Sequence, residues 1–259
     1  MAWPGRRRDL GRLTARRALI TGGSSGIGAA TARAFAAHGV RVAIAGRNVA
    51  ALEHVAVDTG GIFIPGDLRE PGCARRTIDT AIDALGGLDI VVSNAGIGWA
   101  GPLGSMSEAD IDALLDVNLR APVHLVRAAL PHLRPGLGRL VFVGSIAGVV
   151  GVPGEAWYSA TKAGLRCLAD SLRAELQPAG IGVSLVSLGV VDTAYFERRR
   201  VPYERRHPRL LSANTAADAI VDAVALGRDD VLVPAWLSFP ARLKASFPGL
   251  YRILAARFA

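Results

Sequence analysis

The chain has 259 residues, of which 51% are hydrophobic, and its 30 lysine and arginine residues outnumber its 22 acidic residues to give a formal net charge of +8. This length and hydrophobic content exclude a disordered chain and allow a large core. The basic residues are spread along the sequence without a nucleic-acid-binding motif, so we expect no nucleic-acid partner. No apolar run is long enough to span a bilayer or resembles a secretory signal, so we expect a cytoplasmic protein.

Short apolar, β-branched runs alternate with amphipathic stretches along the chain. The runs expected to form strands are 17–21, 40–46, 61–67, 88–94, 138–145, 181–189 and 231–234. They are nearly continuous in apolar residues, which is typical of parallel strands buried on both faces. The repeated strand–helix–strand units predict an α/β fold of Rossmann type, a doubly wound seven-stranded parallel sheet with helices on both faces. No linker divides the sequence, so we expect residues 1–259 to form a single domain, with 1–13 flexible.

A glycine-rich turn follows the first expected strand. The sequence TGGSSGIG occupies residues 21–28 and leads into an alanine-rich helix. Gly22 permits a tight turn, Gly26 lets the backbone approach a pyrophosphate, and Gly28 lets the helix pack closely on the strand. The free N–H groups at the start of the helix would then face the anion. The position between a strand and a helix favours dinucleotide binding over an ordinary glycine-rich turn.

The second expected strand ends at AGRN, residues 45–48, without an acidic residue. A carboxylate at this place would bind the adenosine ribose hydroxyls and repel a 2′-phosphate. Arg47 can instead pair with that phosphate, and Asn48 can add a donor. We therefore expect NADP(H) to be favoured over NAD(H). The alternative is that Arg47 is a solvated surface charge.

Polar residues follow at and after the fourth expected strand. SNAG, residues 93–96, ends that strand. Asn118 lies in LLDVNLRAPVHL, an otherwise apolar helical stretch in which a polar amide requires an explanation. Asn118 is either part of a site or a core asparagine bonded to the backbone.

A serine, a tyrosine and a lysine come next. Ser145 ends the fifth expected strand, at the carboxyl edge where ligands bind in such sheets. Tyr158 and Lys162 are one helical turn apart and share a helix face. An ammonium beside a phenol lowers the phenol pKa and improves it as an acid–base group. The compact head of a lysine can also reach ribose hydroxyls. Taken alone, such a pair also occurs on ordinary helix surfaces.

Together, TGGSSGIG, SNAG, Asn118, Ser145 and YSATK resemble the short-chain dehydrogenase/reductase family in its single-domain branch, over about residues 14–234. The resemblance implies hydride exchange between a nicotinamide and a ketone/alcohol pair. It implies that Tyr158 is the general acid, or the base in oxidation, and that Ser145 orients the substrate oxygen. Lys162 would bind the nicotinamide ribose and lower the tyrosine pKa, and Asn118 would hold a water that links Lys162 to solvent.

The same resemblance implies a set of cofactor contacts. Asp67 in GDLRE corresponds to the position that contacts adenine, although an N-cap of the following turn explains it equally well. The expected cofactor-binding residues are Gly22, Ser24, Ser25, Gly26, Ile27, Gly28, Arg47, Asn48, Asp67, Leu68, Asn94, Ala95, Gly96, Tyr158, Lys162, Gly189, Val191 and Thr193. The chain departs from the family where Leu188-Gly189 stands in place of the common Pro-Gly. Without the fixed φ of proline, the geometry of that loop stays open.

Residues 192–212 lie where the family places its substrate lid and are dense in arginine and proline. The arginines of this lid are Arg198, Arg199, Arg200, Arg205, Arg206 and Arg209. They would attract an anionic substrate such as an acyl carrier or a CoA thioester. The alternative is a solvated basic loop.

The C-terminal extension, residues 234–259, mixes aromatic and basic side chains. Its apolar members are Trp236, Leu237, Phe239, Leu243, Phe247, Leu250, Tyr251, Leu254 and Phe258. An apolar face beside arginines is typical of an interfacial helix pair. Packing on the protein's own substrate pocket or on a second subunit is the alternative. We expect an apolar substrate with a lipid, steroid or acyl body, and leave open a weak contact with a membrane surface.

These features predict an NADP(H)-dependent oxidoreductase that acts on a small-molecule carbonyl or alcohol as a homodimer or homotetramer. One alternative is a 3-oxoacyl-thioester reductase whose anionic carrier binds the basic lid. Another is a non-catalytic NADP-sensing protein, although a sensor would be expected to lose the tyrosine or the lysine. A sugar-nucleotide epimerase would space its glycines differently. The five histidines and two cysteines show no ligand spacing, so no metal is expected.

Overall fold

The computed structural model describes residues 13–199, 201 and 208–255. Residues 1–12 of the segment expected to be flexible lie outside the described residues, whereas Leu13 is fully buried. Three of the lid arginines and one aromatic residue of the C-terminal extension also lie outside the described residues, namely Arg200, Arg205, Arg206 and Phe258.

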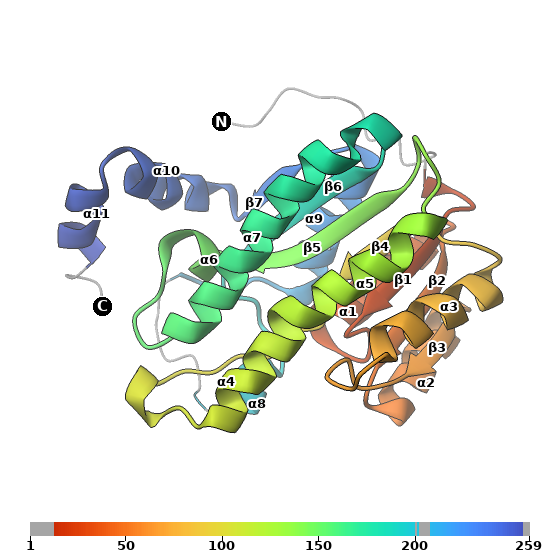
Figure 1. Cartoon of the computed structure of the whole chain (residues 1–259), viewed down its shortest axis with the longest axis horizontal. Helices are drawn as coiled ribbons and strands as arrows, with labels where there is room; N and C mark the ends of the chain where they lie inside the picture. The colour runs from red at the N-terminus through yellow and green to blue at the C-terminus, as the bar shows by residue number, and fades with distance from the viewer. Residues whose placement is uncertain (1–12, 200, 202–207, 256–259) are drawn as a thin grey trace.

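The described residues form a seven-stranded parallel sheet in the order β3-β2-β1-β4-β5-β6-β7, which confirms the predicted fold (Figure 1). The strands are β1 (Arg17–Thr21), β2 (Arg41–Gly46), β3 (Ile62–Pro65), β4 (Ile90–Ser93), β5 (Arg139–Ser145), β6 (Gly182–Leu188) and β7 (Asp230–Val233). β1 pairs with both β2 and β4, so the strand order reverses at β1. Ligands of such sheets bind at the carboxyl ends of the strands beside this reversal.

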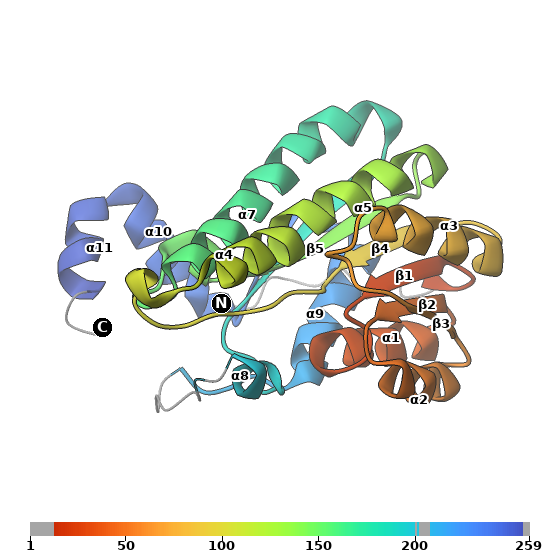
Figure 2. The same cartoon turned by 60° about the horizontal axis from the view of Figure 1, so that its bottom comes forward.

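Helices cover both faces of the sheet (Figures 1 and 2). One face carries α3 (Cys73–Leu85), α4 (Glu108–Leu115), the π-helical turn η3 (Asp116–Arg120), α5 (Ala121–Ala129) and α7 (Ala156–Leu176), and the other carries α1 (Gly26–Ala37), α2 (Val49–Thr59) and α9 (Ala213–Ala225). The shorter helices are η2 (Leu103–Ser105), η4 (Leu130–His132), α6 (Ala147–Val150), η5 (Gln177–Ala179) and α8 (Tyr195–Arg198).

Each face of the sheet has its own apolar core. Along β5, Val141 and Val143 belong to the core beneath α1 and α9, whereas Leu140 and Phe142 belong to the core beneath α5 and α7. Side chains alternate between the faces of a strand, so a strand buried on both faces must be apolar at nearly every position. This requirement explains why the sequence predicts the strands so directly.

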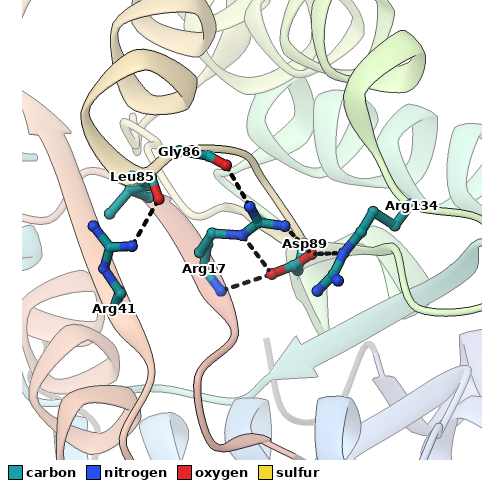
Figure 3. Close-up of polar contacts among 6 residues, drawn as sticks. All are labelled: Arg17, Arg41, Leu85, Gly86, Asp89 and Arg134. Carbon is teal, nitrogen blue, oxygen red and sulfur yellow. Dashed lines mark hydrogen bonds and ion pairs between the residues drawn. The ribbon is translucent and has the colours of Figure 1, made fainter.

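An ionic cluster ties the strands together at the opposite, amino edge of the sheet (Figure 3). The carboxylate of Asp89 is fully buried and accepts hydrogen bonds from the backbone N and Nε of Arg17 at 2.9 Å and from Nε of Arg134 at 2.6 Å. Burial alone would raise the pKa of Asp89, but these hydrogen bonds outweigh it and lower the pKa to about 2. Beside this cluster, Nη1 of Arg41 donates to the carbonyl of Leu85 at 2.9 Å.

The C-terminal extension forms the expected helix pair. Its elements are η6 (Ala235–Leu237), α10 (Ser238–Ser246) and α11 (Pro248–Ala255). The helices α10 and α11 lie at one end of the molecule in both views, and α10 contacts α6 (Figures 1 and 2). Nζ of Lys244 donates to the carbonyl of Val149 in α6 at 3.0 Å. Its large exposed apolar side chains are Trp236, Phe239, Phe247, Leu250 and Ile253.

Candidate active site

The turn between β1 and α1 has the backbone that its glycines predict. Gly22 and Gly26 have φ of 67° and 53°, in the left-handed region that favours glycine. A Cβ on Gly28 would lie 2.2 Å from the carbonyl oxygen of Gly22, so only glycine fits there. Ser25 is the N-cap residue of α1 and makes no side-chain capping hydrogen bond. The first N–H groups of α1 are therefore left to an anionic ligand.

Arg47 directly follows β2, as predicted, and its side chain is 58% exposed. Its Nη1 is 3.7 Å from Oδ2 of Asp67, on the loop that follows β3. Asn48 uses Oδ1 to cap α2, by accepting from the N–H of Ala51 at 3.1 Å. This cap does not occupy the amide nitrogen of Asn48, which is the donor that we expected to serve a phosphate.

A second arginine, Arg69, lies close to Arg47 and Asp67. The sequence analysis did not predict it. Oδ1 of Asp67 accepts from the backbone N–H of Arg69 at 3.0 Å, so the capping alternative for Asp67 describes its side chain. The guanidinium of Arg69 also pairs with both carboxylate oxygens, and these bonds lower the pKa of Asp67. Two guanidiniums, from Arg47 and Arg69, thus surround one carboxylate and leave a net positive charge. The only sequence signal was a basic residue two positions after the aspartate.

Asn94 joins the loop after β4 to the glycine turn. Its Nδ2 donates to the carbonyl of Thr21 at 2.9 Å and to that of Gly22 at 3.3 Å. The backbone N–H groups of Asn94 and Ala95 each donate to Oγ1 of Thr21 at 3.1 Å. Thr21, which the sequence reasoning did not single out, therefore fixes the spacing between these two loops.

Asn118 lies in the π-helical turn η3 and is 1% exposed. Its Oδ1 accepts from the N–H of Ile97 at 2.9 Å, and its Nδ2 donates to the carbonyl of Ile97 at 2.9 Å and to Oγ1 of Thr161 at 3.2 Å. The alternative of a core asparagine bonded to the backbone therefore describes its side chain. Single π-helical turns within helices are frequent at functional sites. The expected role in holding a water stays a prediction.

Tyr158 lies in the first turn of α7, beside the carboxyl end of β5. Ser145 ends that strand, and its Oγ accepts from the N–H of Ala147 at 3.1 Å. Burial raises the pKa of Tyr158, while the hydroxyls of Tyr195 and Ser145 act in the opposite direction. Tyr158 is therefore a neutral phenol at pH 7, in the form that can donate a proton.

Lys162 is buried, with an exposed fraction of 7%, and its Nζ donates to the carbonyl of Val143 at 3.0 Å. Burial lowers the pKa of Lys162 from 10.5 to about 8. Nζ lies 5.9 Å from the ring centre of Tyr158. Burial is the largest influence on the pKa of Tyr158, and the expected lowering of that pKa by Lys162 stays a prediction.

The loop after β6 keeps its place without the family's proline. Leu188 is the last residue of β6 and is 2% exposed, and the N–H of Gly189 donates to the carbonyl of Val233 at 2.7 Å. Val191 is buried. A Cβ on Gly26 would lie 3.0 Å from Cγ2 of Thr193, so this loop lies directly against the glycine turn. The hydrogen bond to β7 thus holds the loop after β6, which lacks the fixed φ of a proline at position 188.

The lid segment begins with α8, and its arginines do not all face solvent. Arg199 forms a largely buried ion pair with Glu155, the residue just before α7. Nη1 of Arg198 donates to Oγ of Ser25 in the glycine turn at 3.4 Å, whereas Arg209 is exposed. The sequence did not predict that Arg199 pairs with Glu155 or that Tyr195 lies beside Tyr158, because in each case the partner is distant in sequence.

One cavity of about 2460 Å³ connects these residues. The predicted site residues that line it are Gly22, Ser24, Ser25, Gly26, Ile27, Arg47, Asn48, Asp67, Leu68, Asn94, Ala95, Gly96, Ser145, Tyr158, Lys162, Gly189, Val191 and Thr193. Gly28 and Asn118 lie behind its wall. Ligand pockets are typically about 300–1,000 Å³, so this cavity has room for a dinucleotide and a substrate together. Leu243, Tyr251 and Leu254 of the C-terminal extension line its outer part.

A family model and several curated proteins are similar to this chain in sequence. A family model described as short chain dehydrogenase matches residues 16–203. The mouse protein "Dehydrogenase/reductase SDR family member 7B" is 30% identical over 260 residues, covering 92% of this chain and 80% of that protein. Nodulation protein G of Rhizobium sp. (strain N33) is 38% identical over 189 residues, covering 72% and 77%. Ketoacyl reductase HetN of Nostoc sp. is 34% identical over 231 residues, covering 85% and 79%.

Two solved structures are also similar. A short chain dehydrogenase from Burkholderia cenocepacia in complex with NADP has a TM-score of 0.78 and 34% identity, covering 86% of this chain and 97% of that chain. A short chain dehydrogenase/reductase from Burkholderia phymatum in complex with NAD has a TM-score of 0.82 and 26% identity, covering 92% and 96%. These two similar proteins therefore differ in the dinucleotide that each was solved with.

Proposed function

Because this chain belongs to the short-chain dehydrogenase/reductase family of oxidoreductases, we propose that it interconverts a ketone and a secondary alcohol with NADP(H). The observation that carries the proposal is the meeting of Tyr158, Ser145 and Lys162 on the cavity that begins at the glycine turn. The three side chains come from β5 and α7, so rigid elements fix their relative positions.

The residues of the cavity fit a dinucleotide. The left-handed glycines, the close backbone packing at Gly28 and the uncapped start of α1 suit a pyrophosphate. When bound, the nicotinamide supplies the hydride in reduction and accepts it in oxidation. The buried ammonium of Lys162, at the floor of the same cavity, is the donor available for ribose hydroxyls.

The proton is moved by the protein. In reduction, Tyr158 donates its hydroxyl proton to the substrate oxygen as the carbonyl becomes an alcohol, and in oxidation it accepts that proton. Ser145 donates a hydrogen bond to the same oxygen and holds it against Tyr158. Burial favours the neutral phenol, so Tyr158 is in the correct form for reduction at neutral pH.

The reaction class is tested by following NADPH consumption over a panel of ketones of increasing size. Tyr158→Phe removes only the transferable proton, so turnover should fall to background while NADPH binding stays nearly intact. Lys162→Ala should weaken both, because Lys162 serves the ribose and the acid–base group. If Tyr158→Phe kept more than about a tenth of the wild-type rate, a loss below about 1.4 kcal/mol, another residue would have to be the acid.

Preference for NADP(H) over NAD(H) is supported by Arg47 and by the unexpected Arg69, which together outweigh the charge of Asp67. Arg47→Ala should therefore weaken NADPH binding much more than NADH binding in a fluorescence titration. Gly46→Ala at the neighbouring position changes no charge and is the control. Equal affinity of the wild type for the two cofactors would reject this preference.

An apolar substrate is supported by the C-terminal extension, because its half-buried side chains Leu243, Tyr251 and Leu254 line the outer cavity. A second candidate is a 3-oxoacyl thioester, which the similarity to a ketoacyl reductase and the exposed Arg209 favour. Comparing kcat/KM for an apolar ketone and for the corresponding acyl-carrier thioester separates the two. A carrier preference that disappears at high salt would select the thioester.

Within the described part of the C-terminal extension, residues 234–255, five large apolar side chains are exposed, and the sequence of the extension contains basic but no acidic residues. In the described part of the chain, no helix combines the length and hydropathy needed to cross a bilayer. The exposed apolar side chains beside basic residues support weak peripheral contact with anionic lipid. Sedimentation with and without anionic vesicles tests the contact with lipid.

The expected homodimer or homotetramer is testable by light scattering.

A further inference from the structure

A second phenol lies beside the proposed acid. Tyr195 begins α8, and its ring centre is 6.1 Å from that of Tyr158, with the ring planes at 54°. The hydroxyl of Tyr195 is buried and has no hydrogen-bond partner among the residues that the structure describes. Buried polar groups are nearly always paired, so an unpartnered hydroxyl at a reacting centre indicates a partner that forms during the reaction.

The position of Tyr195 is held by several contacts. Its N–H donates to Oγ1 of Thr193 at 3.3 Å. One turn later, Arg199 pairs with Glu155 and so fastens the end of α8 to the start of α7. A Cβ on Gly98 would lie 2.0 Å from the hydroxyl oxygen of Tyr195, so the absence of a side chain at Gly98 makes the space for this hydroxyl. The lid and the loop after β4 are thus shaped around the phenol.

The reacting oxygen of the substrate is not the natural partner. A carbonyl oxygen has two lone pairs, and the proposed mechanism gives one to Tyr158 and the other to Ser145. An acceptor beside the Tyr195 hydroxyl is the oxygen of Tyr158, since each of these two hydroxyls acts on the pKa of the other, and this oxygen becomes a stronger acceptor when it ionises. We propose that Tyr195 is a positioning residue whose hydroxyl donates to the Tyr158 oxygen and stabilises its ionised form. This inference rests on the proposed function only for its catalytic consequence.

The charges around Tyr158 agree with this role. Glu155 raises the pKa of Tyr158 and Arg199 lowers it, but these two groups pair with each other, so their effects oppose. Nζ of Lys162 lies 5.9 Å from the centre of the Tyr158 ring. Burial raises the pKa of Tyr195 well above 10, and the neighbouring Tyr158 raises it further. Tyr195 therefore keeps its proton when Tyr158 loses its own, as a donor must.

The direct test measures the pKa of Tyr158 without turnover. The chain has only four tyrosines, so ring-labelled tyrosine gives an NMR spectrum in which Tyr158→Phe assigns the signal of interest. With NADP⁺ bound, Tyr195→Phe should raise the pKa of Tyr158 by roughly one to two units, the range expected for a lost hydrogen bond to a charged group. Tyr251→Phe, which removes another hydroxyl from the same cavity, is the matched control and should change nothing. An unchanged Tyr158 pKa in Tyr195→Phe overturns the inference.

The catalytic consequence is a pH profile. Oxidation of an alcohol requires ionised Tyr158, so Tyr195→Phe should move the rising limb of kcat/KM to higher pH by the same amount. At a fixed pH below that limb the rate should fall about tenfold or more, with the KM for NADP⁺ unchanged. A raised substrate KM with an unmoved limb would show that Tyr195 binds the substrate instead, and would reject the proposal. A wild-type protein that oxidises no alcohol, while the NMR difference persists, would reject the proposed function and leave the Tyr195–Tyr158 contact standing.

Discussion

Lys162 should cost the protein stability, and replacing it by methionine should make the cofactor-free protein more stable. Burial lowers the pKa of Lys162 from 10.5 to about 8, and each pKa unit corresponds to about 1.4 kcal/mol, so carrying the ammonium at pH 7 costs about 3 kcal/mol. Methionine fills similar space without a charge. Its introduction leaves the carbonyl of Val143 without its donor, which costs about 1–2 kcal/mol. The net gain in the free energy of unfolding at pH 7 should be about 1–2 kcal/mol.

The pH dependence distinguishes this reasoning from a simple packing effect. Between about pH 8 and 10.5 the unfolded chain still binds the proton of Lys162 while the folded chain releases it, so wild-type stability rises with pH relative to Lys162→Met. Urea unfolding of the two proteins at pH 7 and near pH 10 should therefore reverse their order. Lys244→Met, which removes a partly buried lysine that also donates to a backbone carbonyl, is the control and should give no gain. A Lys162→Met protein that is less stable at pH 7, by an amount that does not change with pH, would refute the argument.

Three further outcomes follow from the structure. Asp89→Asn should lower the free energy of unfolding by about 2 kcal/mol at pH 7, because the pKa of Asp89 falls from 3.8 to about 2, and this difference should vanish as the pH drops from about 4 toward 2 in urea titrations. Gly28→Ala should abolish NADPH binding measured by fluorescence, since its Cβ would collide with the carbonyl of Gly22, whereas Gly249→Ala, with open space around it, should bind normally. Deleting residues 241–259 should raise the KM for bulky apolar ketones more than for small ones, and equal values in a truncated protein that still binds NADPH would contradict the tail's role.

The fold and most of the site could be predicted because both depend on local sequence. Buried parallel strands must be apolar throughout, and the glycine turn needs glycine at fixed places, so short windows suffice to find them. What the sequence could not predict is contacts between distant segments. Asn118 bonds to the backbone of Ile97 and to Thr161, and the hydroxyl of Tyr195 is among the groups that act on Tyr158. A local sequence pattern does not predict which loop a side chain will contact, or how exposed to solvent a tyrosine hydroxyl will be.

The strand order also explains why the role of Arg69 was missed. The end of β2 carries no carboxylate, yet β3 lies beside β2 and brings Asp67 and Arg69 close to Arg47. Predicting cofactor preference from the end of β2 alone is therefore incomplete, because the ends of β2 and β3 border the same space. The charge that a 2′-phosphate would meet is the sum over both loops.

The reversal of strand order at β1 has a consequence for protein engineering. Arg47 and Arg69, which we propose to select the cofactor, lie before β4, whereas the proposed acid–base residues and α8 come after it. Cofactor choice and chemistry are thus separable along the chain, but the cores are not, because Phe35 packs in one core with Ile220 and Ile78 shares the other with Leu165. Recombining whole halves of two relatives would disrupt both cores at once. Transplanting only the loops after β2 and β3 would leave both cores intact. We therefore expect the preference for NADP(H) or NAD(H) to be exchangeable between relatives by this smaller graft.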